Sequence, residues 1–75
     1  MPWLSSFGIF FSNRALDQVR MSVAQTHANV KFGAAYTGLA AGLAGKTHVD
    51  VSDLATLRAM PGMTILAPVD AAETA

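Results

Sequence analysis

One segment constrains the fold of this chain more than any other. Residues 30–36 read VKFGAAY and are apolar almost throughout, with Lys31 as their single charge. Strands that are covered on both faces of a parallel sheet have such continuous apolar runs, whereas half-exposed antiparallel strands alternate. We therefore expect residues 30–36 to form a strand that is buried on both faces, in an α/β fold with a parallel sheet.

Helical patterns surround this strand. Residues 9–28 carry Leu16, Val19 and Val23 on one helical face, and Asn29 is the expected left-handed stop. Residues 50–60 form the second expected helix, with Asp50 as its N-cap.

The remaining segments complete an alternating order. Residues 1–6 are read as a strand end, residues 37–47 as a Gly- and Ala-rich loop, and residues 63–67 as a short buried strand. Asp70 and Glu73 have capping-box spacing and predict the start of a third helix. Apolar strands that alternate with helices favour a parallel sheet with right-handed crossovers.

The charge content excludes several classes of partner. Only 13% of the residues are charged, against about 25% in ordinary globular proteins. Net charge is zero, so the chain lacks the basic field that nucleic acid would need, and we expect no nucleic-acid partner. No uncharged run approaches the ~20 residues of a membrane span, so we expect no membrane partner and a cytoplasmic location. We expect other protein to cover much of the surface.

A short pattern at residues 40–47, AAGLAGKT, matches a loose phosphate loop. In such loops a helix begins at the Lys-Thr pair, but His48 and Val49 intervene here before the expected cap at Asp50. A nucleotide binder is therefore kept only as a remote alternative.

Candidate site residues gather in the strand-to-helix loops. Phe7, Phe10 and Phe11 cluster at the first such turn, either as core or as a flat apolar pocket for a ring. His48 lies in the Gly-rich loop before the second helix, with a ligand role and a structural role both open. Ligands of open α/β sheets bind at the carboxyl ends of the strands, so we expect Phe7 and His48 at the same edge. His27 is expected to be exposed near a helix end, and no metal site is expected because the histidines lie far apart in a chain without cysteine.

Two motif blocks are SSFGIFFSNRALDQVRMSVA and GLAGKTHVDVSDLATLRAMPGMTILAPVDAAE. Together they resemble the pyrimidine-binding domain of transketolases. SSFGIFFSNRALDQVRMSVA is similar to that family's Ser/Thr-Phe-x-x-Phe run followed by R-A-x-D-Q-x-R. GLAGKTHVDVSDLATLRAMPGMTILAPVDAAE is similar to the family's G-E-D-G-P-T-H-Q, a helix, and P-x-D-x-x-E. The match is closest to the C-terminal-half type of transketolase. Deoxyxylulose phosphate synthases and beta subunits of 2-oxo-acid dehydrogenases share the domain and stay open.

The resemblance implies site roles. Phe7 and Phe10 would lie against the aminopyrimidine ring of thiamine diphosphate, and His48 would face the substrate. Gly42 and Gly45 match the family's turn glycines. No catalytic residue is assigned in this chain.

The chain also departs from the family pattern. Tyr36 stands where the family often has His, and Leu43 and Ala44 stand where it has Glu and Asp. Val49 stands where the family has Gln, and Lys46 stands where it has Pro. Lys46 is a candidate to attract a substrate phosphate.

The resemblance further implies a truncated domain, a three-layer, partial doubly wound parallel sheet over residues 1–75. The family's catalytic Glu lies upstream of the first strand, and its diphosphate and magnesium motif belongs to another domain. We therefore expect a fragment of a thiamine diphosphate-dependent enzyme of carbohydrate metabolism that transfers a two-carbon ketol unit between sugar phosphates.

The fragment itself is expected to be inactive and to bind no cofactor alone. Its partner would be the diphosphate-binding domain or subunit, across a dimer interface in a homo-oligomer or heterotetramer. The alternative is a non-catalytic interaction module derived from the same domain.

Overall fold

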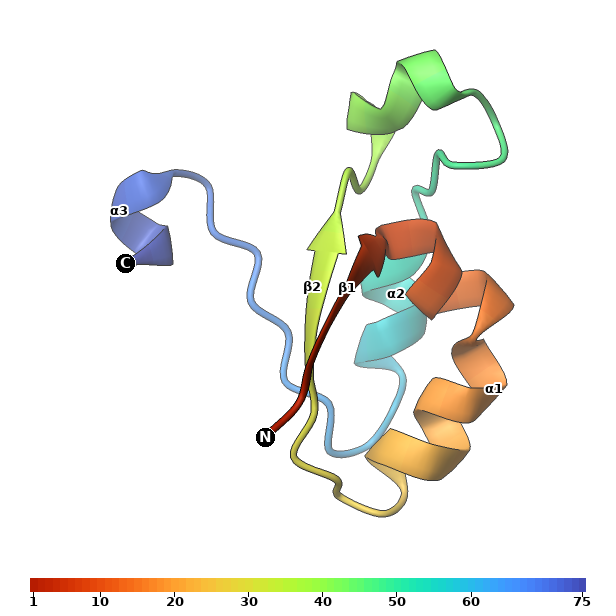
Figure 1. The fold of residues 1–75 in the computed structure, drawn as a ribbon, viewed down its shortest axis with the longest axis vertical. Helices are drawn as coiled ribbons and strands as arrows, with labels where there is room; N and C mark the ends of the chain where they lie inside the picture. The colour runs from red at the N-terminus through yellow and green to blue at the C-terminus, as the bar shows by residue number, and fades with distance from the viewer.

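The computed structural model describes the backbone of residues 1–75 and the side chains of residues 1–39 and 42–75. Two strands, β1 (Trp3–Phe7) and β2 (Lys31–Ala35), form a parallel pair. Their register runs from Trp3 opposite Lys31 to Phe7 opposite Ala35, and both strands point toward the same end of the molecule (Figure 1). The predicted parallel arrangement is confirmed for these two strands.

The crossover between the strands is helical but is not one regular α-helix. It consists of η1 (Phe10–Arg14), α1 (Leu16–Gln18) and η2 (Val19–Ala24), where η1 and η2 are π-helical. The amide of Ala15 donates to the carbonyl of Phe10 at 2.7 Å, a bond that spans five residues instead of four. The helix expected over 9–28 is thus irregular, and its last helical segment ends at Ala24.

The left-handed residue that stops this helix is His27, with φ 53°, so the prediction for Asn29 is wrong. The amide of Ala28 donates to the carbonyl of Val23, and that of His27 donates to Ala24. This pair of bonds is a Schellman motif, which places the left-handed position directly behind the last helical turn. His27 is exposed there, as expected.

The second half of the chain contains three short helices. The segment 37–47, expected to be a loop, contains the 3₁₀ helix η3 (Leu39–Ala44) between two glycines of positive φ. The helix expected over 50–60 is α2 (Asp53–Arg58), and its N-cap is Ser52 in place of the predicted Asp50. The last helix, α3 (Ala71–Thr74), has the predicted cap. Asp70 accepts from the amide of Glu73 at 2.9 Å, and Glu73 accepts from that of Val69 at 2.8 Å.

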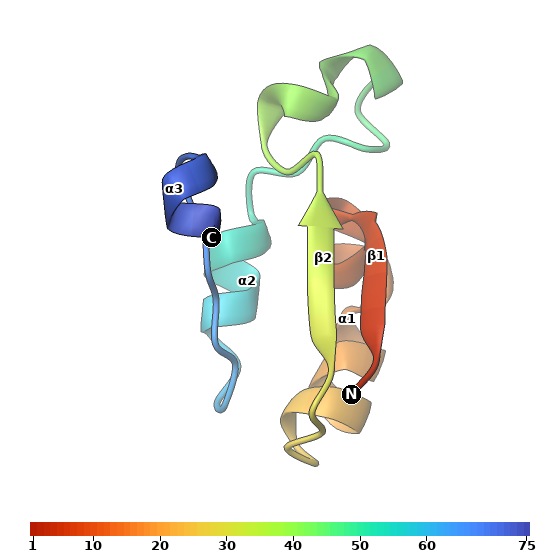
Figure 2. The ribbon, with the colours of Figure 1, turned by 60° about the vertical axis from the view of Figure 1, so that its left-hand side comes forward.

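The strand expected over residues 63–67 is not formed. Within the described residues the sheet has two strands, and the chain after α2 runs outside it without strand pairing (Figure 2). An apolar segment becomes a strand only where a neighbour accepts its hydrogen bonds, and Leu66 is instead 86% exposed.

The core lies between the sheet and its helices. Val19, Ala24 and Met60 are buried, and Phe32 and Leu57 are among the residues packed against them. The crossover helices and α2 lie on the same side of the two strands (Figures 1 and 2). β2 has no fully buried residue and exposes Lys31 and Ala34, so the prediction of burial on both faces is wrong for these residues. A strand is buried on both faces only when a second layer covers its far side.

None of the helices in the described part of the chain combines the length and the apolar character that crossing a bilayer requires.

Candidate functional site

Four rings meet where the two parallel strands end. Phe7 is the last residue of β1, Tyr36 follows β2, Phe10 opens η1, and His48 comes from the turn before α2. We call these four side chains the ring cluster. Both strands point to this end of the molecule (Figure 1). The topology therefore brings the rings together.

His48 makes close edge contacts in the ring cluster. Its ring centroid lies 4.8 Å from that of Phe7 at 79° and 5.3 Å from that of Phe10 at 67°. Phe7 and Phe10 contact each other at 6.0 Å. The expectation that Phe7 and His48 share one edge of the sheet is confirmed, and such edge-to-face pairs are favoured by ring quadrupoles.

His48 is oriented by the turn that precedes it. Its Nδ1 lies 2.9 Å from the hydroxyl of Thr47, and its amide donates to the carbonyl of Gly45 at 3.0 Å. Gly45 has φ 76°, a conformation that favours glycine, so the turn that presents His48 depends on this residue. The ring is half-buried.

Two members of the site were not predicted from the sequence. Tyr36 stacks on Phe7 with centroids 5.3 Å apart and planes at 28°, and the guanidinium of Arg14 lies 4.6 Å from the centroid of Phe10. Phe10 and Arg14 are four positions apart in a helical segment, so their spacing could have indicated this cation–π contact. Tyr36 joins the ring cluster because the chain makes a left-handed turn directly after β2, in which the φ of Tyr36 is 51°.

The predicted cluster of three phenylalanines divides between two places. Phe11 turns away from Phe7 and Phe10 and packs on Phe32 of β2 at 4.9 Å. Neighbouring positions of a helix point in different directions, so Phe11 joins the core side while Phe10 faces the strand ends.

A buried polar group lies behind the ring cluster. Asp50 is 6% exposed, and its Oδ2 accepts from the hydroxyl of Ser12 and, at 3.0 Å, from the side-chain amide of Asn13. Its Oδ1 accepts from the amide of Ser52 at 2.8 Å and from the Ser52 hydroxyl at 2.6 Å. Asp50 was predicted to be the N-cap of α2, but Ser52 takes that position, and the carboxylate of Asp50 joins two segments that are far apart in sequence.

Burial and hydrogen bonding act on the Asp50 carboxyl in opposite directions. Desolvation raises its pKa, but the hydrogen bonds from the Ser12 and Ser52 side chains and from the amides of Ser52 and Val51 outweigh it. The pKa of Asp50 is therefore lowered from its ordinary value, and the group is a carboxylate at neutral pH.

The phosphate-loop pattern lacks the geometry of a nucleotide site. Its first two side chains, at residues 40 and 41, lie outside the described residues. No helix begins at Lys46 and Thr47, since the next helix starts at Asp53 and the Thr47 hydroxyl contacts His48. A phosphate loop needs a helix N-terminus at the Lys-Thr pair, and this chain has a turn there.

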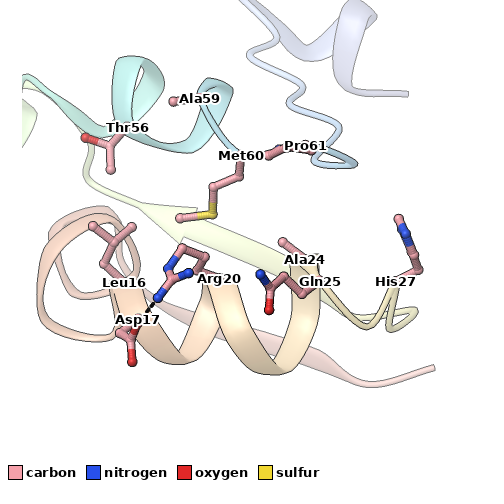
Figure 3. A pocket seen from close by; sticks show the side chains of 10 residues that line it. All are labelled: Leu16, Asp17, Arg20, Ala24, Gln25, His27, Thr56, Ala59, Met60 and Pro61. Carbon is pink, nitrogen blue, oxygen red and sulfur yellow. Dashed lines mark hydrogen bonds and ion pairs between the residues drawn. The ribbon is translucent and has the colours of Figure 1, made fainter.

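A groove of about 740 Å³ lies away from the ring cluster, between the crossover helices and the end of α2. Met60, two residues after the end of α2, lines the groove together with Leu16 and Ala24, and the ion pair of Asp17 with Arg20 lies on the rim of the groove (Figure 3). Three residues of the groove, Leu16, Ala24 and Met60, also form or border the core. Among the described side chains no group of three His, Asp or Glu is placed to hold a metal ion.

Comparisons with known proteins agree on one domain family. Residues 1–75 match the family described as transketolase, pyrimidine binding domain. A 6-deoxy-6-sulfo-D-fructose transketolase subunit of a Clostridium species is 42% identical over 73 residues, which are 97% of this chain and 23% of that protein. An apulose-4-phosphate transketolase subunit of Phocaeicola vulgatus is 42% identical over 65 residues, 87% of this chain and 21% of that one.

Longer relatives match as well. Human transketolase is 34% identical over 74 residues, 99% of this chain and 12% of the enzyme. The chain thus spans less than a quarter of the length of these relatives. No solved structure matches the chain significantly.

Proposed function

Because this chain belongs to the transketolase pyrimidine-binding domain family, we propose that it supplies the pyrimidine side of a thiamine diphosphate site. The parent enzyme would transfer a two-carbon ketol unit between sugar phosphates. The observation that carries the proposal is the ring cluster, in which Phe7, Phe10 and His48 meet at the carboxyl ends of two parallel strands. Open α/β sheets bind their ligands at this edge.

The residues present fit the aminopyrimidine end of the cofactor. Phe7 and Phe10 are half-buried and offer flat apolar surface, which suits an aromatic ring. Bound thiamine diphosphate would supply the nucleophilic carbon that the transfer of a two-carbon unit requires. The described side chains include no carboxylate in the ring cluster and no cluster for magnesium, so this chain's residues fit the ring and not the diphosphate.

We assign His48 to the substrate side of the site. Its ring is fixed by two phenylalanine edges and by Thr47, so a nitrogen–hydrogen group would be held in one direction toward a substrate oxygen. A preoriented donor loses little freedom when charge develops on that oxygen. Lys46 is exposed two residues away and would attract a phosphate group of the substrate.

The diphosphate would be held by a separate domain or subunit, with the active site at the interface between the two. Two relatives named as transketolase subunits and a third named as a C-terminal section support an enzyme of several chains. The 13% charged residues and exposed apolar side chains such as Trp3, 70% exposed, and Leu66 fit a domain that other protein covers. We propose that residues 1–75 are part of a three-layer, doubly wound domain whose second helical layer covers the open face of β2.

A non-catalytic interaction module is the second candidate. Leu43 and Ala44 stand where the family pattern has Glu and Asp, and both are exposed, Leu43 fully so. An exposed leucine in place of a carboxylate favours contact with protein over contact with a sugar hydroxyl. In this case the ring cluster only packs the domain, and the exposed Leu43 and Ala44 contact the partner protein.

A segment exchange distinguishes the two candidates. The matching segment of human transketolase is replaced by residues 1–75 of this chain, and cofactor affinity and ketol transfer are both measured. We expect the chimera to bind thiamine diphosphate with magnesium and to transfer ketol units. A folded chimera that binds no cofactor rejects the proposed function and favours the interaction module. Binding without transfer keeps the pyrimidine-binding role and rejects the substrate roles assigned to His48 and Lys46.

A further inference from the structure

We propose that Asp50 is a positioning residue that fixes His48 against Phe7 and Phe10. It does so by tying the turn that carries His48 to the helical turn that carries Phe10. The inference deepens the proposed function and rests on it, since it concerns the residues assigned to the pyrimidine and substrate side of the site.

The tie consists of one carboxylate that serves two segments. Oδ2 of Asp50 accepts from Ser12 and Asn13, which follow Phe10 by two and three positions on η1. Oδ1 accepts from the amide and hydroxyl of Ser52, on the segment that leads into α2. Asp50 itself is two residues after His48, so the bonds join the His48 turn directly to η1.

Burial makes this tie specific for an ionised carboxylate. Ser12 is 1% exposed and Asp50 is 6% exposed, so neither group can exchange its partner for bulk water. A buried polar group without a hydrogen bond is costly, and here both oxygens of Asp50 are satisfied only in the observed arrangement. The lowered pKa of the carboxyl agrees with donors that favour its charged form.

The same residue also holds the opposite side of the ring cluster. The backbone of Asp50 forms an antiparallel bridge with Gly38, two residues after Tyr36. Through its side chain and its backbone, Asp50 therefore joins the turns that carry Phe10, His48 and Tyr36. The intervening residues 42–47 are exposed and pack little, so the position of His48 relative to η1 depends on Asp50.

The two histidines allow a direct test by NMR of the chain labelled with ¹³C-histidine and ¹³C-valine. His27 is exposed and serves as the internal reference, whereas ring currents of Phe7 and Phe10 should displace the His48 signals from those of His27. We expect Asp50→Asn to remove most of this displacement while the methyl signals of buried Val19 keep their folded positions. A merely structural role would change the Val19 and His48 signals together.

Asp70→Asn is the matched control, because Asp70 also accepts from a backbone amide but caps α3 far from the rings. It should leave His48 unchanged. If Asp50→Asn also shifts the Val19 signals, Asn13→Ala decides, since it removes one donor at an exposed position. We then expect a smaller His48 shift in the same direction with Val19 unchanged.

The proposal is overturned if His48 keeps its displacement in Asp50→Asn while the Val19 signals are unchanged. Where Asp50→Asn shifts the Val19 signals, the proposal is overturned if His48 keeps its displacement in Asn13→Ala. It is also overturned if the signals of His48 and His27 coincide in the unsubstituted chain. The measurement needs no cofactor. A chimera that fails to bind thiamine diphosphate would thus reject the proposed function and leave the positioning role intact. Conversely, an NMR result against the positioning role would leave the proposed function intact.

Discussion

Replacing Gly8 by alanine should destabilise the fold because Thr37 occupies the space of the new methyl group. Gly8 is buried in the turn between β1 and η1. An added Cβ would lie 2.5 Å from Cγ2 of Thr37, where ordinary contacts are 3.4–4 Å. Its next neighbours, Cβ of Thr37 at 3.5 Å and a carboxylate oxygen of Asp53 at 3.6 Å, are at normal distances. The substitution therefore tests a single contact.

Two opposing effects determine how far Gly8→Ala changes the free energy of unfolding. Overpacking a filled site costs about 1–3 kcal/mol, and a β-branched side chain has few rotamers with which to retreat. Gly8 has no positive φ, so alanine would otherwise stabilise by about 0.4–1 kcal/mol through the unfolded state. We expect the overpacking term to win and the free energy of unfolding to fall by about 1–2 kcal/mol.

A double-mutant cycle isolates this contact. Urea unfolding, followed by far-ultraviolet circular dichroism, is compared for Gly8→Ala, Thr37→Ala and the double variant. In the Thr37→Ala background the obstructing methyl is gone, so Gly8→Ala should become stabilising by about 0.4–1 kcal/mol. The reasoning is refuted if Gly8→Ala stabilises the chain that retains Thr37, or if its effect is the same in both backgrounds.

Three further outcomes follow from the structure. Because the pKa of Asp50 is lowered in the folded chain, its stabilisation is complete above the ordinary carboxyl pKa of about 3.9 and is lost as the pH falls through the folded value. Unfolding measured across this acid range should show a flatter decline for Asp50→Asn, and an unchanged decline would contradict the assignment. Met60→Ala should lower the free energy of unfolding by about 2–5 kcal/mol because it removes a large side chain from a core of three buried residues. Met21→Ala, at a 44% exposed position, should lower it far less. Equal losses would show that Met60 does not belong to the core. In the transketolase chimera, His48→Ala should reduce kcat/KM about 100-fold or more with cofactor affinity retained, and an unchanged kcat/KM would leave His48 a packing residue.

Local chemistry and topology explain what could be predicted from the sequence. The apolar run at 30–36 indicated a parallel strand, and strand-to-helix order alone placed Phe7 and His48 at one edge, where they touch. The capping box of Asp70 and Glu73 could also be predicted from the sequence, since its partners are three residues apart. Such features depend on short spacing or on sheet direction, both of which a sequence displays.

The wrong predictions concern features that depend on partners far away in the sequence. Asp50 has the residue type and place of an N-cap, but its carboxylate bonds to Ser12, which is 38 positions away. The π-helical turns that bring Ser12 inward have no clear sequence signature, and they also shift the helix end so that His27 takes the left-handed position. Residues 63–67 have strand composition, but a strand also requires a paired neighbour.

The most direct test of the central claim is the Kd of thiamine diphosphate, with magnesium, for the transketolase chimera and its Phe10→Ala variant. Loss of a ring that contacts the aminopyrimidine should weaken binding about tenfold, since each 1.4 kcal/mol is a factor of ten and an aromatic contact contributes a similar amount. Trp3→Ala is the matched control, because Trp3 is an exposed aromatic residue at the opposite end of β1 from Phe7. The account predicts a higher Kd for Phe10→Ala and the original Kd for Trp3→Ala. Equal Kd values for the chimera and Phe10→Ala would contradict it.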